Sequence, residues 1–200
     1  MGSGQAPVIL ASGSAIRKQL LSGAGLRFTV DAADIDERAV AMSLAEQPVA
    51  ERARGLAAAK ALSVASRHPG ALVIGADQML ELDGEVLSKA LTASAARNVL
   101  KRLRGRAHHL HSGVAIAKNG EIVWSLAQSA TLHVRAFSDR WLDDYCATAG
   151  EALTKSVGAY QLEGLGVQLF ERIEGDYFTI LGLPLLPLLA ELRRLGLIED

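Results

Sequence analysis

The chain has 200 residues, half of them hydrophobic and 22% charged, which excludes a disordered or fibrous protein. Its 21 basic and 22 acidic residues leave a net charge of -1, which argues against a general nucleic-acid coat, because binding to a duplex needs a surplus of Lys and Arg. A small anionic substrate held by a few cations is compatible with this balance. The single cysteine, Cys146, cannot form an internal disulfide, which fits a reducing cytosol and predicts a cytoplasmic protein.

No targeting signal is recognisable in the sequence. The apolar residues 8–11 lack the basic leader of a signal peptide, and the uncharged run 177–190 is shorter than the ~20 residues that a membrane span needs. We therefore expect a soluble chain without a membrane partner. We also expect one domain over residues 6–197 after a disordered leader of residues 1–5, because the sequence has no repeat and no low-complexity linker.

Apolar periodicity and turn residues predict an alternation of strands and helices along the chain. The predicted strands are 7–11, 27–32, 71–76, 78–82, 85–87, 106–118, 121–135, 167–173 and 177–181, the last two paired, and the predicted helices are 15–23, 48–66, 92–104, 138–147 and 184–195. Asp83-Gly84 and Asn119-Gly120 each predict an antiparallel hairpin. The predicted fold class is α/β, with a mixed, twisted sheet whose long antiparallel hairpins are flanked by helices.

The segment Ser12-Gly13-Ser14 joins a predicted strand to a predicted helix, with Ser14 as the helix N-cap. Backbone N–H groups at a helix start, two hydroxyls and a glycine that permits close approach are typical of an anion site. Arg17 and Lys18 in the first helical turn could close over bound phosphates. The tripeptide by itself favours the alternative, an ordinary capped turn, and it lacks the Gly-Lys-Ser/Thr of a Walker loop.

Asp77 follows the apolar strand 71–76, so we expect it at a carboxyl end, where α/β folds bind ligands. A carboxylate there can ligate a divalent metal or take a proton from water, and the alternative is a turn-forming Asp. Lys60 lies among small residues and Lys89 follows a short strand, although each lysine alone is more typical of a solvated surface. The acidic turn 34–37 is compatible with metal binding but favours a solvated loop.

The tract His108-His109-Leu110-His111 has the composition of a metal-binding segment. In a strand, however, His109 and His111 face one side and His108 the other, with no cysteine beside them. The tract therefore favours partly exposed strand histidines. Cys146, inside a predicted helix without an adjacent histidine, favours a packing role.

Several short motifs follow one another in a specific order from residue 7 to residue 196. They are Leu10–Arg17 (LASGSAIR), Leu56–Ala61 (LAAAKA), Ile74–Asp77 (IGAD), Ser88–Ala90 (SKA), Glu163-Gly164, Leu169–Gly175 (LFERIEG) and Gly182–Leu185 (GLPL). In this order they resemble the Maf (septum-formation-inhibitor-like) family of nucleoside triphosphate pyrophosphatases. Ala15, Ser88 and Ala90 depart from the Pro, Gly and Pro of the family, and none of these departures removes a charged group.

The resemblance implies a Maf/ITPase-like fold with a nucleotide cleft between two lobes. It also implies hydrolysis between the α- and β-phosphates of a nucleoside triphosphate, which gives a nucleoside monophosphate and pyrophosphate, with a divalent cation (Mg, Mn or Co) as cofactor. By position, Asp77 corresponds to the catalytic carboxylate, and Asp77 and Glu37 to acids that hold the metal. The phosphate contacts that carry over are Ser12, Arg17, Lys18, Lys60 and Lys89.

Three further positions bear on base selectivity within this family. One branch acts on dTTP and UTP and another on 7-methyl-GTP; Gln78 and Glu163 match the second branch, while Ile16 stands where that branch has Trp. A carboxylate can accept hydrogen bonds from the guanine N1–H and N2 amino groups and repels the carbonyls of thymine and uracil. The resemblance thus predicts a preference for 7-methyl-GTP, with a tolerance broadened by Ile16, in a house-cleaning role that keeps modified nucleotides out of nucleic acids.

A different class stays open, a non-catalytic nucleotide-binding regulator of cell division or septum formation. The retained Asp77, Lys60 and Lys89 argue against it, because a sensor needs no carboxylate that activates water. An RNA-binding module is disfavoured by the balanced charge and the 4% aromatic content. The expected partner is a nucleoside triphosphate, with no stable nucleic-acid complex, and a homodimer is compatible with the sequence.

Overall fold

The computed structural model describes residues 6–199, which fall into two compact units. The first unit comprises the residues up to Gln78, Ser112–Gln128 and the residues from Tyr177 onward, and the second comprises Met79–His111 and Ser129–Asp176. The single domain over residues 6–197 stays a prediction, and the leader predicted at residues 1–5 lies outside the described residues.

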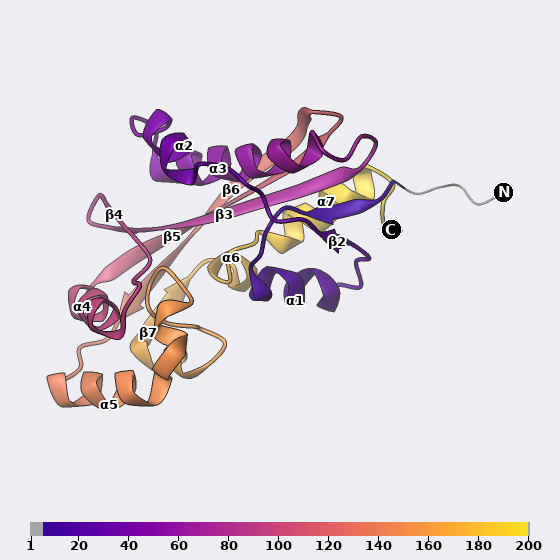
Figure 1. The fold of residues 1–200 in the computed structure, drawn as a ribbon. Helices are drawn as coiled ribbons and strands as arrows, with labels where there is room; N and C mark the ends of the chain where they lie inside the picture. Colours follow the sequence, from indigo (N-terminus) through magenta and orange to yellow (C-terminus); the bar gives the residue numbers. More distant parts are fainter. Residues whose placement is uncertain (1–5, 200) are drawn as a thin grey trace. The chain divides into compact units, whose positions relative to one another are not determined.

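The first unit holds a mixed sheet in the strand order β2-β1-β3-β5-β6 (Figure 1). Its elements are β1 (Val8–Leu10), α1 (Ala15–Gly23), β2 (Thr29–Val30), α2 (Glu37–Ser43), α3 (Val49–Ala65), α6 (Tyr177–Ile180) and α7 (Leu185–Arg194), with parts of β3 (Leu72–Leu82), β5 (Ala107–Lys118) and β6 (Glu121–Val134). β1 runs parallel to both neighbours, with Ile9 opposite Thr29 and Val73. The turn between β5 and β6 has φ values of 51° at Asn119 and 82° at Gly120, as the predicted hairpin requires.

Helices cover both faces of this sheet (Figure 1), because alternate strand residues are apolar on both sides. The face against α3 is built from small and β-branched residues, including Ile9, Ala57, Ala61, Val64, Val73 and Ala115. The face against α1 and α7 is built from larger residues, including Leu10, Leu21, Ile74, Ile116, Leu188 and Leu192. The small residues of the first face let α3 lie close to the strands.

Two glycines permit this close approach of α3. A Cβ added to Gly75 of β3 would lie 2.1 Å from the carbonyl oxygen of Ala57, and one added to Gly113 of β5 would lie 2.3 Å from that of Ala53. Neither distance is tolerable between a carbon and a backbone oxygen, so only glycine fits at these two positions. Because the backbones of α3 and β3 are in contact at Gly75, side chains on this side of α3 can reach neighbouring residues of β3.

The second unit has the strand order β4-β3-β5-β6-β7. Its elements are β4 (Glu85–Leu87), α4 (Ala93–Leu103), α5 (Asp139–Ala149), the 3-10 helices η1 (Gly150–Thr154) and η2 (Leu165–Leu169), and β7 (Phe170–Glu174), with the remaining parts of β3, β5 and β6. β4 pairs antiparallel with β3, and β7 with β6. Thr92 and Ser138 cap α4 and α5 by accepting hydrogen bonds from the amides of Ala95 and Trp141.

The α/β class is confirmed, but the predicted strand break at Asp77 is wrong. Residues 71–76 and 78–82 belong to one continuous strand, β3, which has Asp77 in its middle. Gly75 lies inside this strand, where it permits the close packing of α3. Glycine inside a strand often marks such a close backbone approach.

Two other local predictions are also wrong. The segment predicted as the strand 177–181 begins with the short helix α6, and β7 in the segment 167–173 pairs with β6 instead. A short apolar run carries too little periodicity to separate strand from helix. The helix α2 was not predicted at all; the acidic turn ends in its N-cap, where Asp36 accepts a hydrogen bond of 2.9 Å from the amide of Ala39.

Among residues 6–199, none of the helices combines the length and the apolar character that crossing a membrane requires.

Candidate active site

The candidate site lies in the first unit, where β1 ends beside β3. β1 pairs with β3 as far as Leu10 opposite Ile74, while β3 continues to Leu82. Beyond Ile74, β3 no longer pairs with β1. There Arg17, in the first turn of α1, donates a hydrogen bond of 3.0 Å to the carbonyl oxygen of Ala76. Asp77 therefore stands beyond the carboxyl end of the neighbouring parallel strand β1, which is where α/β sheets place ligands.

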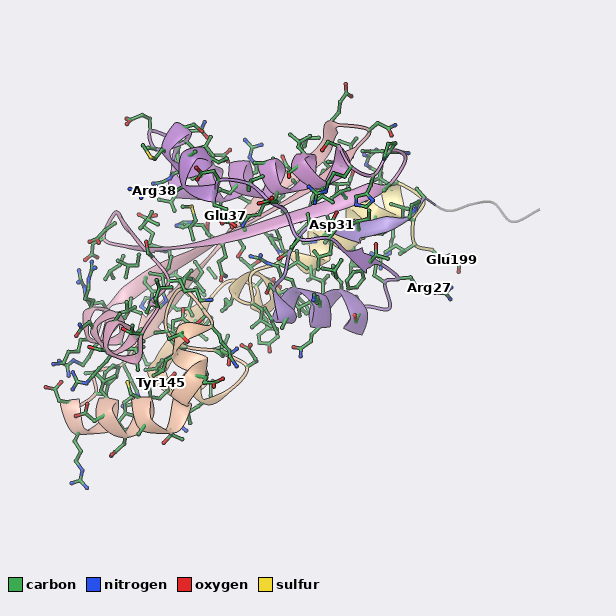
Figure 2. All side chains as sticks on the ribbon, viewed as in Figure 1. Arg27, Asp31, Glu37, Arg38, Tyr145 and Glu199 are labelled. Atoms are coloured by element: carbon green, nitrogen blue, oxygen red, sulfur yellow. The ribbon has the colours of Figure 1, made fainter. Side chains whose placement is uncertain are left out.

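A charged cluster occupies the α3 face of β3. The ammonium of Lys60 lies 2.6 Å from Oδ1 of Asp77 and 3.0 Å from Oε2 of Glu37. The side chains of Lys60 and Asp77 are only 11% and 13% exposed, whereas that of Glu37, in the first turn of α2 (Figure 2), is 59% exposed. One cation thus bridges two carboxylates that come from different elements.

The sequence around Lys60 explains why it pairs in this way. Lys60 lies on the buried side of α3 beside Ala57 and Ala61, the residues that contact the backbone of β3 at Gly75. An ammonium that is removed from water costs several kcal/mol unless it is paired. Asp77, two residues after Gly75 and on the same face of the strand, supplies the paired charge.

Asp77 and Glu37 are also the two acids predicted to hold a metal. Among residues 6–199, no group of three or more His, Cys, Asp or Glu side chains is arranged to hold an ion. Two carboxylates nevertheless fit a magnesium-like cation, which is commonly bound through one or two carboxylates together with waters and substrate phosphates.

The loop Ser12-Gly13-Ser14 has the features of an anion site. The hydroxyl oxygen of Ser12 accepts hydrogen bonds from the amide of Ser14 at 3.3 Å and from Nη1 of Arg17 at 3.1 Å. Because the oxygen accepts in both bonds, the hydroxyl hydrogen is left to donate to a bound oxygen. Ser14 occupies the predicted N-cap position of α1, but its side chain forms no capping hydrogen bond.

Arg17 is held by the protein more firmly than a mobile phosphate clamp would be. Its Nε donates to the carbonyl oxygen of Gly182 at 2.8 Å, and Nη1 donates to Ser12 and Ala76. Burial lowers the pKa of Arg17 below its ordinary value, and attraction to Asp77 and to Glu37 opposes this shift. Its contact with phosphate stays a prediction; the structure shows a guanidinium that ties the loop after β1 to β3 and to the end of α6.

The opposite face of β3 carries a neutral network around Gln78. The amide nitrogen Nε2 of Gln78 lies 3.1 Å from Oγ of Ser112, 3.2 Å from the carbonyl oxygen of Thr179 and 2.9 Å from that of Ile180. Ser112 and Thr179 are fully buried. Sequence reasoning named Gln78 but not Ser112 or Thr179; the signal for Ser112 is a lone hydroxyl in a strand that is apolar from Val114 onward.

The remaining predicted residues take two kinds of position. Ile16 and Lys18 are partly buried in the first turns of α1, in the first unit. Lys89, just after β4, and Glu163, just before η2, are exposed residues of the second unit. The roles predicted for these four residues stay predictions.

The histidine tract in β5 does not form a metal site among the described residues. His109 is exposed, but His108 is fully buried and lies 2.7 Å from the hydroxyl of Tyr160, so the prediction of partial exposure fails for this residue. Burial lowers the pKa of His108 to about 4. The aromatic rings of Tyr160 and Phe170 pack around it, a partnership that the sequence does not reveal.

The site belongs to an α/β protein in which a buried lysine bridges two carboxylates, and in which Arg17 links Ser12 to Ala76, the residue before Asp77. Residues 7–195 match the model of the Maf-like protein family, and the chain belongs to this family.

Relatives of known name cover nearly the whole chain. A nucleoside triphosphate pyrophosphatase of Maricaulis maris is 53% identical over 192 residues, 96% of this chain and 98% of the relative. A 7-methyl-GTP pyrophosphatase of Rhizobium meliloti is 50% identical over 199 residues, again 96% and 98%, and one of Bartonella quintana is 47% identical over 193 residues with the same coverage. Among solved structures, a HAM1 protein from Coxiella burnetii has a TM-score of 0.42 and 16% identity, covering 64% of this chain and 73% of that one.

Proposed function

We propose that this protein is a nucleoside triphosphate pyrophosphatase, a hydrolase that cleaves between the α- and β-phosphates and releases a nucleoside monophosphate and pyrophosphate. The Maricaulis maris relative with this name is 53% identical to it over 98% of that relative's length. The cluster of Lys60, Asp77 and Glu37 supports the assignment of this activity to particular residues. Arg17 connects this cluster to the loop that contains Ser12.

The proposed chemistry divides among these residues. Lys60 and the hydroxyl of Ser12 donate to phosphate oxygens, where hydrogen bonds to a charged group are roughly twice as strong as neutral ones. Asp77 uses one oxygen for Lys60, which leaves the other to take a proton from the attacking water or to hold a metal ion. Arg17 keeps the loop of Ser12 fixed to Ala76, the residue directly before Asp77.

We also propose that a divalent cation, Mg, Mn or Co, serves this site. Asp77 and Glu37 are the residues that would hold it, and the cation would supply charge stabilisation to the triphosphate. With the cation bound, the ammonium of Lys60, which has three N–H donors, would keep its contact with Oδ1 of Asp77 and donate to a phosphate oxygen as well.

We propose 7-methyl-GTP as a preferred substrate over dTTP. Gln78 and Glu163 support this preference, as do two relatives that are named for the methylated nucleotide. Ile16 offers a poorer stacking surface to a cationic base than Trp does, so selectivity is expected to be broader than in a Trp-bearing relative. A cytoplasmic house-cleaning role, without a stable nucleic-acid complex, fits this substrate, the single cysteine and the balanced charge.

The test is pyrophosphate release from a panel of canonical and methylated triphosphates with Mg, Mn or Co. The proposal expects release with at least one metal and a higher kcat/KM for 7-methyl-GTP than for dTTP. Nucleotide binding without release would instead support a non-catalytic regulator of cell division. A kcat/KM for dTTP equal to or above that for 7-methyl-GTP would reject the preference, and an unchanged ratio in Glu163→Gln would remove Glu163 as its cause.

A further inference from the structure

The neutral network on the α6 side of β3 fixes the orientation of one side chain completely. A carboxamide has a donor end, the NH₂ group, and an acceptor end, the oxygen, and the two ends have nearly the same shape. In Gln78 the nitrogen end faces the carbonyl oxygens of Thr179 and Ile180, which can only accept. The reverse orientation would set the amide oxygen against two carbonyl oxygens.

Ser112 completes this arrangement from the neighbouring strand β5. Its hydroxyl donates a hydrogen bond of 2.8 Å to the carbonyl oxygen of Thr179, so its oxygen can only accept from Nε2 of Gln78, at 3.1 Å. Ser112 is fully buried, and an unpaired hydroxyl there would cost about 1–3 kcal/mol. The hydroxyl therefore holds its proton toward Thr179 and presents the amide of Gln78 with a third acceptor.

The acceptors themselves come from the end of the short helix α6. The last carbonyls of a helix have no partner within that helix and need donors from elsewhere. The carbonyl oxygen of Thr179 accepts hydrogen bonds from the amide of Gly182 at 3.0 Å, from Ser112 and from Gln78, whereas that of Ile180 accepts from Gln78 at 2.9 Å. The carbonyl of Ile180 thus needs the nitrogen end of Gln78, so the oxygen end of the amide is the one that remains for a ligand.

The remaining end is the oxygen Oε1 of Gln78. No donor within residues 6–199 is assigned to it, and Gln78 is partly exposed although Ser112 and Thr179 are buried. A Cβ added to Gly182 would lie 3.5 Å from this oxygen and 3.4 Å from Nη2 of Arg17. Oε1 of Gln78 and the guanidinium of Arg17 therefore both lie beside Gly182.

We propose that Ser112 is a positioning residue that, with the carbonyls of α6, locks Gln78 so that it offers only an acceptor to the bound nucleotide. The recognised group is a hydrogen-bond donor, either an N–H of the base or an O–H of the ribose. Gln78 faces away from Asp77 and Lys60, so the contact serves recognition and not the chemical step. This inference rests on the proposed nucleotide substrate and names the group of that substrate that Gln78 meets.

The test measures equilibrium binding, by calorimetry, of non-hydrolysable α,β-methylene triphosphates to the full chain. The probes are the analogues of GTP, of 2′-deoxy-GTP, of 3′-deoxy-GTP and of purine riboside triphosphate, whose base has no N–H. In Gln78→Met, the preference for guanosine over purine riboside is expected to fall by roughly 2- to 10-fold, the range for one neutral hydrogen bond. If the donor is a ribose hydroxyl, the preference over the matching deoxy analogue falls instead, which supports the lock and identifies the donor.

A double-mutant cycle tests the role of Ser112. Ser112→Ala is expected to weaken the same preference in the wild-type background and to leave it unchanged in the Gln78→Met background, because Ser112 acts through Gln78. Ser112→Cys, which has a weak S–H donor, is the second variant should Ser112→Ala fail to fold. Ser125→Ala is the matched control, since its hydroxyl accepts a hydrogen bond of 3.1 Å from Arg54 and lies outside the network.

Two results would overturn the inference: equal effects of Ser112→Ala in both backgrounds, or no change of either preference in Gln78→Met. Hydrolysis is followed separately as pyrophosphate release from GTP and 7-methyl-GTP by the wild-type protein. Binding of the analogues without any release would reject the proposed function and still decide the inference about Ser112.

Discussion

The two faces of strand β3 carry different kinds of polar group on neighbouring residues: a charged cluster at Asp77 and a neutral network at Gln78. On the α3 face, Asp77 pairs with a buried ammonium, and every partner in the cluster carries a charge. On the α6 face, Gln78 contacts two carbonyls and a hydroxyl, and every partner is neutral. Because successive strand residues point to opposite faces, one step along the backbone separates the proposed chemistry from the proposed recognition.

The largest expected effect comes from Asp77 on the charged face. Asp77→Asn keeps the shape but removes the carboxylate, so turnover should fall by ~10²-fold or more, the scale of a lost general base. The relative affinities of Asp77→Asn for the different α,β-methylene nucleotides should stay close to those of the wild type, because the α6 face is intact. The measurements are pyrophosphate release and calorimetry. Asp143→Asn, which removes an exposed carboxylate paired with Arg97, is the control and should behave as wild type; near-normal turnover in Asp77→Asn would reject the assignment.

Lys60 should show the next largest effect. Lys60→Met retains much of the apolar stem but removes the cation that bridges Asp77 and Glu37, and kcat/KM should fall by about 10- to 100-fold, the scale of a hydrogen bond to a charged group. Lys101→Met, at a surface lysine 3.7 Å from Asp139, serves as control. A loss of melting temperature in proportion to the loss of activity would make Lys60 structural.

The close approach of α3 can be broken without touching a charged residue. In Gly75→Ala the new methyl group meets the backbone at Ala57, so the free energy of unfolding should fall by about 1–3 kcal/mol, as in other overpacked cores. Activity should also fall, because Lys60 moves with α3. Gly13→Ala is the contrast for stability, since a Cβ there meets no protein atom within 4 Å. Denaturant unfolding measures both variants, and equal stability of the two would contradict the packing argument.

The smallest expected effect concerns the stability of the protein in acid, which depends on His108 in β5 and not on either face of β3. The pKa of His108 falls from about 6.5 in an unfolded chain to about 4 in the fold, so between these values only the unfolded state binds the proton. Stability from this residue should therefore be complete above pH 6.5 and decrease by about 1.4 kcal/mol for each pH unit below it, down to pH 4. In His108→Gln the difference in unfolding free energy between pH 7 and pH 5.5 should shrink, whereas the exposed His109→Gln should keep it.

Local sequence was sufficient for most elements. The turns Asp83-Gly84 and Asn119-Gly120 lie where they were predicted, and Thr92 and Ser138, the first residues of two predicted helices, cap α4 and α5. These φ values and hydrogen bonds involve residues only a few positions apart. The helix α6 was missed because four residues carry no helical period. The order of short motifs was sufficient for the family, which the match over residues 7–195 confirms.

Only the tertiary structure decided how the site residues meet. The bond between Lys60 and Asp77 depends on how closely α3 lies on Gly75, and the sequence shows the glycine without showing what approaches it. The lock on Gln78 uses partners 34, 101 and 102 residues further along the chain. Propensity and capping act over a few residues, whereas a buried polar group is satisfied by whatever donor or acceptor the packing brings to it. For this reason the sequence named the charged residues, and the fold decided which partners they and Gln78 have.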